Sequence, residues 1–146
     1  MKGNMQIRRF GAVGVCLLFV SASACEAAPS TILKSVSNCG RLSIPADAKL
    51  ISHLDDSHFR AQTWEAVVDM SAAEVSDFES RSGLGVFEPG VPPDWRQKYW
   101  KDVGNSSVLQ QDTGNEHSPQ PGYPSRWVVV HNSGGDTRRV FIRTEC

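Results

Sequence analysis

The feature that most constrains this chain is the stretch from Trp64 to Leu84, where a period of two changes to a helical pattern. Apolar side chains at positions 64, 66, 68 and 70 alternate with Glu65 and Asp69, and only position 67 departs from the alternation. Such alternation predicts a half-buried strand. It ends at Ser71, which together with Glu74 has the sequence of a capping box at a helix start.

The predicted helix after Ser71 has signals at both of its ends. Met70 precedes the cap and Val75 lies four positions into the helix, so the two can close as a hydrophobic staple. Gly83 supplies the left-handed residue that ends a helix, and Leu84 can fold back onto Phe78. We therefore expect a strand that leads directly into a short helix, which lies on the sheet through Val75 and Phe78.

Three further strand-like segments flank this unit and complete two hairpins. Residues 49–54 and the strand at Trp64 surround a turn at 55–57, and residues 126–131 and 138–146 surround a turn at 132–137. The order β-β-α-β-β predicts a small α+β domain of two layers, with an antiparallel sheet of about four strands and one helix on one face. Between helix and second hairpin we expect a Pro-rich loop, one or two helical turns at 95–101, and a long loop at 102–125 with a brief strand at 108–109.

The first 24 residues have the pattern of a signal peptide. Lys2, Arg8 and Arg9 form a positive segment, and an apolar run of 11 residues follows from Phe10 to Val20. A membrane-spanning helix needs about 20 apolar residues, so this run is too short to span a bilayer. Ala22-Ser23-Ala24 also satisfies the small-x-small pattern of ordinary signal peptidase cleavage.

The sequence Ala22-Ser23-Ala24-Cys25 resembles a bacterial lipobox, although Leu is usual at the position of Ala22. The resemblance covers only the signal and implies that Cys25 becomes the first mature residue and carries a lipid. It would anchor the chain in the cell envelope, facing the periplasm or the exterior. Ordinary cleavage remains the alternative, and it would give a secreted soluble protein.

The number of cysteines favours the lipidated form. The chain has four Cys, and Cys16 lies in the apolar run that is removed. If Cys25 carries a lipid, only Cys39 and Cys146 remain, and we expect them to pair in an oxidising compartment. Without the lipid, Cys25 is a free thiol. The disulfide would close a loop of about 100 residues and contribute about 4–5 kcal/mol by the chain-entropy model.

Composition and length limit the remaining possibilities. Three of the 15 basic residues and none of the 16 acidic residues precede Cys25, so the mature chain has a net charge of −4. A mildly acidic chain argues against general nucleic-acid binding. We expect a tether at residues 25–37, which are mostly small and polar, followed by one domain at residues 38–146.

The sequence contains few signals of catalysis or metal binding. His53 and His58 flank the first turn beside Asp55 and Asp56, and these side chains are of types that bind transition metals. Polar residues at a tight turn are more commonly just solvated, so they are weak metal candidates. No nucleophile elbow and no cofactor motif occurs, so we expect neither catalysis nor a cofactor.

Two groups of residues are candidates for partner binding. Trp95, Tyr99 and Trp100 form a dense aromatic group beside the Pro-rich loop, and such a group either binds a partner or packs the loop onto the core. In the last strand, Val140, Ile142 and Thr144 share one parity and should face inward. Arg139, Phe141 and Arg143 should then face outward as a binding surface, unless the Pro-rich segment covers Phe141.

These observations favour a small, envelope-anchored binding protein without catalytic activity. It would hold a protein partner of unknown identity, for example a secreted protein that it neutralises. The alternative is a small periplasmic hydrolase or ligand-binding enzyme that uses residues 102–125 as a lid.

Overall fold

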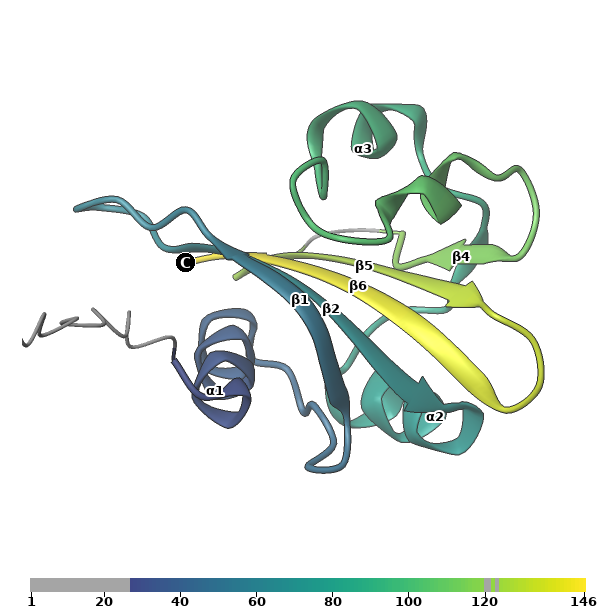
Figure 1. Ribbon diagram of the computed structural model, residues 1–146, viewed down its shortest axis with the longest axis horizontal. Coiled ribbons are helices and arrows are strands. Elements are labelled where there is room, and N and C mark those ends of the chain that lie inside the picture. Colours follow the sequence, from purple (N-terminus) through teal and green to yellow (C-terminus); the bar gives the residue numbers. More distant parts are fainter. Residues whose placement is uncertain (1–26, 120–121, 123) are drawn as a thin grey trace, which may run out of the picture.

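A six-stranded antiparallel sheet forms the centre of the computed structural model, which describes residues 27–119, 122 and 124–146 (Figure 1). The strand order is β1-β2-β6-β5-β4-β3, and every neighbouring pair is antiparallel. The strands are β1 (Lys49–Asp55), β2 (Thr63–Ser71), β3 (Glu88–Pro89), β4 (Asn115–His117), β5 (Ser125–Asn132) and β6 (Thr137–Glu145). The signal segment and Cys25 lie outside the described residues.

The two predicted hairpins are confirmed as β1–β2 and β5–β6. They join at the centre of the sheet, where β2 and β6 pair in unbroken register from Thr63 opposite Glu145 to Ser71 opposite Thr137. The α+β class is therefore correct, but four strands is an undercount. The additional strands β3 and β4 are only two and three residues long and lie in segments that were predicted to be loops.

The predicted helix is α2 (Ala72–Arg81), and both of its ends are as expected. The amide of Glu74 donates to Oγ of Ser71 at 3.2 Å, and the amide of Ser71 donates to Oε2 of Glu74 at 2.7 Å. These bonds to Ser71 hold the pKa of Glu74 below its ordinary value. At the other end, Gly83 has φ 59° and the amide of Leu84 donates to the carbonyl of Glu79 at 3.0 Å.

Most of the expected tether is instead a helix, α1 (Pro29–Gly40), so that prediction was wrong from residue 29 onward. Ile32 and Val36 lie one turn apart, and both are buried in the core against the sheet. The spacing of these two residues was present in the sequence. It was obscured by the Ser and Thr residues around them, which are exposed or only partly buried.

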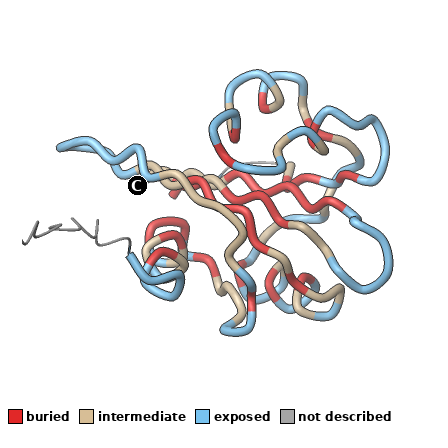
Figure 2. The backbone as a smooth tube through the Cα atoms, in the orientation of Figure 1, coloured by how far each residue is buried: buried red, intermediate tan, exposed pale blue. Residues whose placement is uncertain are grey.

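Both faces of the sheet are covered, which gives three layers instead of two (Figure 2). On one face α1 and α2 pack over Ala66, Val68, Val140 and Ile142. The opposite face, which carries Phe141 on β6, is covered by residues 91–110. That segment contains α3 (Pro93–Lys98) and the 3₁₀ helix η1 (Ser106–Gln110), and η1 includes the residues 108–109 that were expected to form a strand.

The disulfide between Cys39 and Cys146 is present, with its Cα atoms 5.4 Å apart. Cys146 also exchanges two backbone hydrogen bonds with Gln62, at 2.9 and 3.0 Å. The end of α1, Cys146 and the residue that precedes β2 are thus tied together. No helix in the described part of the chain has the length and apolar character needed to cross a bilayer.

Candidate functional site

Arg139, Phe141 and Arg143 on β6, which were candidates for a partner-binding surface, lie on the sheet face that residues 91–110 cover. We call this covering segment the α3 layer. Phe141 is fully buried under residues 91–110, so the structure shows the alternative in which the Pro-rich segment covers it, and Phe141 does not face solvent. Arg139 is also engaged: its Nε and Nη2 atoms donate to the two carboxylate oxygens of Asp69 at 2.8 and 3.0 Å. The strand alternation was right, but its outer side faces a second core and not water.

Arg143 is the centre of a second ion-pair group. Its Nη1 donates to Oε1 of Glu65 at 2.6 Å, and its Nη2 donates to Oε1 of Glu145 at 2.6 Å. The guanidinium lies 4.5 Å from the ring centroid of Tyr99. Burial alone would lower the pKa of Arg143, but its hydrogen bonds to Glu145 and Glu65 raise it, so the side chain is charged. This arrangement leaves little of Arg143 for a partner.

The aromatic group Trp95, Tyr99 and Trp100 packs the α3 layer onto the sheet. Trp100 is fully buried, with its ring centroid 6.1 Å from that of Phe141 and 6.4 Å from that of Trp95. Its backbone has φ 55°, an unusual value for a bulky residue, and its amide donates to Oε2 of Glu65 at 3.0 Å. The buried carboxylate of Glu65 on β2 therefore binds both the amide of Trp100 and the guanidinium of Arg143 on β6.

His53 and His58 occupy different parts of the first hairpin. His53 is half-buried in β1 opposite Ala66, whereas His58 is exposed near the tip with its Nε2 3.2 Å from the carboxylate of Asp56. The structure does not bring the two imidazoles together with a third ligand. No group of three or more metal-binding side chains occurs within residues 27–119, 122 and 124–146.

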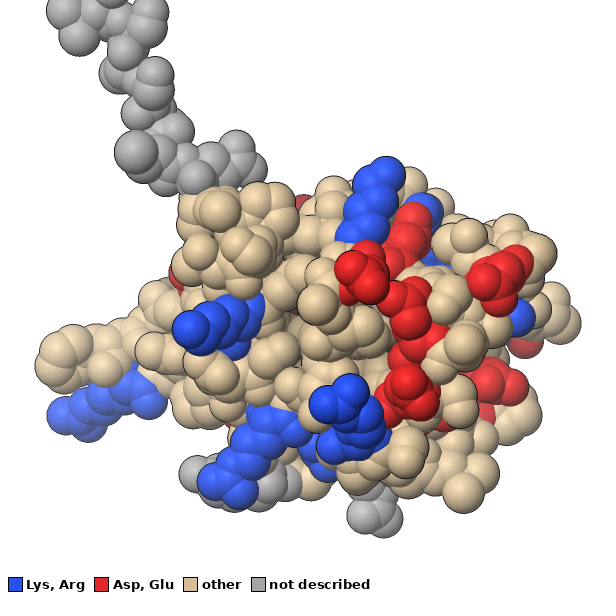
Figure 3. All heavy atoms as spheres, turned by 90° about the horizontal axis from the view of Figure 1, so that it is seen from below, with Lys and Arg blue, Asp and Glu red and all other residues tan. Residues whose placement is uncertain are grey.

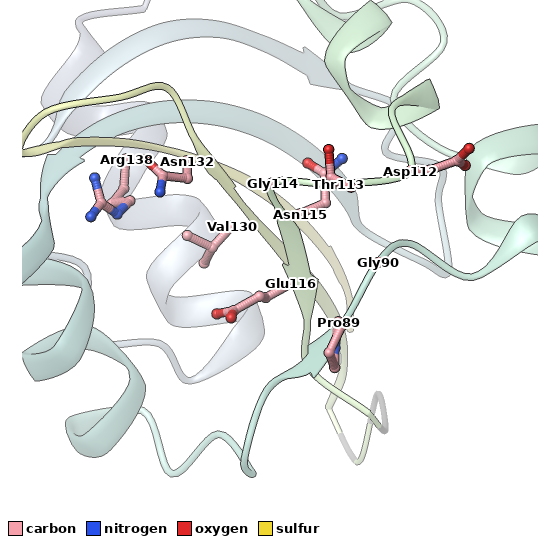
Figure 4. A pocket seen from close by; sticks show the side chains of 10 residues that line it. All are labelled: Pro89, Gly90, Asp112, Thr113, Gly114, Asn115, Glu116, Val130, Asn132 and Arg138. Carbon is pink, nitrogen blue, oxygen red and sulfur yellow. The ribbon is translucent and has the colours of Figure 1, made fainter.

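A hollow lies at the other end of the sheet, where β3, β4 and the β5–β6 turn meet (Figure 4). It has a volume of about 500 Å³. We call it the β4 groove. Its lining combines polar side chains with a few small or apolar residues: Pro89, Gly90, Asp112, Thr113, Gly114, Asn115, Glu116, Val130, Asn132 and Arg138.

One wall of the β4 groove is fixed by the side chain of Asn115. Its Nδ2 donates to the carbonyls of Val108 and Gln111 at 3.0 and 3.1 Å, and its Oδ1 lies 2.9 Å from Nδ1 of His131. Burial, and then the charge of Arg139, lower the pKa of His131, so its imidazole is neutral at ordinary pH and donates to Asn115. The rim at 112–114 is consequently held by β4 and β5.

The floor of the groove comes from the sheet itself. Glu116 pairs with Val130 across β4 and β5, and Asn132 pairs with Arg138 across β5 and β6. In Figure 4 Glu116 extends across the hollow on the side where Asn132 and Arg138 lie, whereas Asp112 points away. Arg138 is oriented by hydrogen bonds from its Nη1 to two carbonyls in the β5–β6 turn, at 2.8 and 3.1 Å.

The electrostatic character of this end is mainly acidic. Burial, and then the charge of Glu116, raise the pKa of Glu79. On the face seen in Figure 3, acidic residues gather over one half, and basic residues lie mostly toward the half from which the β1–β2 hairpin projects. A groove with exposed carboxylates favours a basic ligand.

The chemistry available in the β4 groove is hydrogen bonding and charge attraction. Its lining residues offer carboxylates at Asp112 and Glu116, a hydroxyl at Thr113 and a guanidinium at Arg138. No sequence pattern indicated this site, because its residues come from four strands and from a polar segment without periodicity. Searches against protein families, curated proteins and solved structures found no match to this chain.

Proposed function

We propose that this chain is a non-enzymatic, envelope-anchored lipoprotein whose domain binds a protein partner in the β4 groove. The observation that carries the proposal is the groove itself. It offers a rigid wall at Asn115, an exposed carboxylate at Glu116 and an oriented guanidinium at Arg138, without a catalytic arrangement. Such a surface suits recognition of a polar chain segment.

The proposed anchor is a lipid on Cys25. The lipobox-like sequence supports it, and the Cys39–Cys146 disulfide is consistent with export to an oxidising compartment facing the periplasm or the exterior. Cys25→Ser should abolish incorporation of labelled fatty acid. Incorporation that survives this substitution would contradict the anchor and favour a secreted soluble protein.

The acidic character of the groove indicates a partner with a basic, exposed segment. Burial, and then the charge of Glu116, raise the pKa of Glu79, and a cation bound near Glu116 would offset the second of these contributions. A secreted protein that this chain neutralises is one partner of that kind. Complementary charge would also steer the two proteins together at low salt.

The experiment places a photo-crosslinking residue at Thr113, on the exposed rim, and compares partner capture in cells that carry a second substitution. Glu116→Lys should weaken capture by roughly tenfold or more, because it reverses a charge inside the interface. Asp77→Lys is the matched control, since it makes the same charge change on the exposed side of α2, outside the groove. Equal loss with both variants, or loss with neither, would contradict the groove as the contact site.

The alternative of a small hydrolase with a lid at residues 102–125 has no specific observation in its favour. Residues 106–110 form η1 within the layer that contains α3, and residues 115–117 form β4 within the sheet.

A further inference from the structure

The β1–β2 hairpin projects from the body of the molecule at the end opposite the β5–β6 turn (Figure 1). Every residue from Asp55 to Gln62 is exposed. His58 and Ala61 exchange two backbone hydrogen bonds, at 2.8 and 3.2 Å, so Phe59 and Arg60 occupy the two central positions of the turn. The tip is an ordered hairpin turn with no covering element.

Phe59 is the most unusual side chain of this tip. It is 100% exposed, whereas the aromatic side chains of the α3 layer are mostly buried. A bulky aromatic at the extreme point of a projection contributes nothing to the core. Its position suits contact with something outside the molecule.

Among the residues that the structure describes, the acidic ones near Phe59 do not form an ion pair with Arg60. Asp55 accepts a hydrogen bond from the amide of Ser57 at 3.0 Å, and Asp56 lies 3.2 Å from the imidazole of His58. Arg60 has no ion-pair partner in the described part of the chain. The tip therefore offers an aromatic ring and a free cation side by side.

The hairpin is braced where its exposed tip meets β2. Gln62 is bonded through its backbone to Cys146, which the disulfide joins to Cys39 at the end of α1. The tip is consequently held in a defined direction relative to α1. A preformed projection loses little conformational entropy when it meets a surface.

The proposed anchor, Cys25, precedes α1, which lies at the same end of the molecule as the hairpin tip. In Figure 1 α1 lies in the half from which the hairpin projects, and the described chain begins at Ala27, two residues after Cys25. The only charged residue of α1 is Lys34, which is exposed, and exposed Arg41 follows the helix. Neither forms an ion pair among the described residues.

We propose that the tip of the β1–β2 hairpin inserts Phe59 into the surface of an anionic phospholipid bilayer, the bilayer that holds the lipid on Cys25. The inference rests on the proposed anchoring at Cys25. An aromatic side chain partitions into the interface between headgroups and acyl chains, and Arg60 binds lipid phosphates there. Lys34 and Arg41 add attraction to a negatively charged surface.

This second contact would orient the domain. A lipid at Cys25 alone leaves the domain free to tilt, whereas a second contact at Phe59 fixes two points of one end on the membrane. The β4 groove at the opposite end of the sheet is then directed away from the bilayer, toward partners in the aqueous compartment.

The test uses the mature chain from Cys25 to Cys146, with Phe59→Trp as the reporter. Cys25 is the single thiol outside the disulfide and can be coupled to a maleimide-bearing lipid in vesicles of phosphatidylcholine with about 30% phosphatidylglycerol. Brominated phosphatidylcholine quenches Trp emission in the headgroup and acyl region. Subtracting the emission of the coupled wild-type chain isolates the reporter, and Ser133→Trp in the β5–β6 turn is the matched control.

The proposal predicts that brominated lipid lowers the emission of the Phe59→Trp reporter by roughly twofold or more, because the ring lies in the interface. Ser133→Trp should stay unquenched, and adding Arg60→Glu to the reporter chain should weaken the quenching. Equal behaviour of the two reporters, or an unquenched Phe59→Trp reporter, would overturn the proposal. Crosslinking from position 59 to a protein under the latter result would identify a protein partner instead.

The coupling to Cys25 is chemical, so this result does not depend on lipidation in the cell. Failure of fatty acid incorporation would contradict the proposed anchor, whereas an unquenched reporter would contradict only the contact at the tip.

Discussion

The two faces of the central sheet are covered in different ways. The face under α1 and α2 is an ordinary aliphatic core, built from residues such as Val68, Val75 and Ile142. The face under α3 combines aromatic rings with ion pairs, and it buries the carboxylate of Glu65 almost completely. The difference shows that charged residues at alternate strand positions do not identify a solvent face, because each can be neutralised by a partner on a neighbouring strand.

The largest expected effect comes from removing α1. A chain that begins at residue 38 loses the buried side chains of Ile32 and Val36, each worth about 2–5 kcal/mol in comparable substitutions. Since total domain stability is only about 5–15 kcal/mol, we expect no cooperative thermal unfolding. A chain that begins at residue 27 is the control and should unfold cooperatively. Equal melting temperatures for the two chains would restore the tether that was predicted from the sequence.

The next effect comes from the disulfide, which fastens the α1 face to the end of the sheet. Replacing Cys39 and Cys146 by Ser should lower the free energy of unfolding by about 4–5 kcal/mol on the chain-entropy model. Urea unfolding of the oxidised and substituted chains measures this difference. Free thiols at both positions in native material would remove the basis for it.

The ion pairs of the α3 face should differ in strength. Arg143→Met leaves the buried carboxylate of Glu65 without its cation, which should cost about 3–5 kcal/mol. Arg139→Met is the matched control, because the Arg139–Asp69 pair is more exposed and should cost only about 1 kcal/mol. Equal losses in the free energy of unfolding, measured with urea, would contradict the expected difference between the buried and the more exposed ion pair.

The smallest effect concerns the cap of α2. Ser71→Ala removes an N-cap and should cost about 1 kcal/mol. Because the folded pKa of Glu74 is depressed, its contribution is present above its unfolded pKa and is lost as pH falls through the folded value. Melting temperatures of the wild-type chain should therefore fall more steeply in acid than those of Ser71→Ala. Parallel pH profiles would contradict the role of the Glu74–Ser71 bonds.

The elements with local signals were the predictable ones. The capping box at Ser71, the left-handed residue at Gly83 and the turn residues of both hairpins each act through their immediate neighbours, so the sequence contains the whole signal. The same holds for the inward parity of Val140 and Ile142. The disulfide followed from the count of cysteines and from the strand that returns to the start of the domain.

The α3 layer has no comparable local signal in the sequence. Its stability depends on contacts between residues far apart in the chain, such as Glu65 with Arg143 and Trp100 with Phe141. Taken separately, the charged positions of β2 and β6 have the pattern of strands with a polar face, and residues 95–100 have the pattern of an aromatic loop. The β4 groove has the same origin, since Glu116 and Arg138 are brought together only by the order of the strands.

The most direct test of the comparison between the two faces is the exposure of the tryptophans in the α3 layer. In a Trp64→Phe chain the emission comes from Trp95, Trp100 and Trp127, all of which are buried. We predict blue-shifted emission that acrylamide quenches only weakly. Red-shifted emission that acrylamide quenches strongly would contradict the second core and would return Phe141 and its neighbours to the surface.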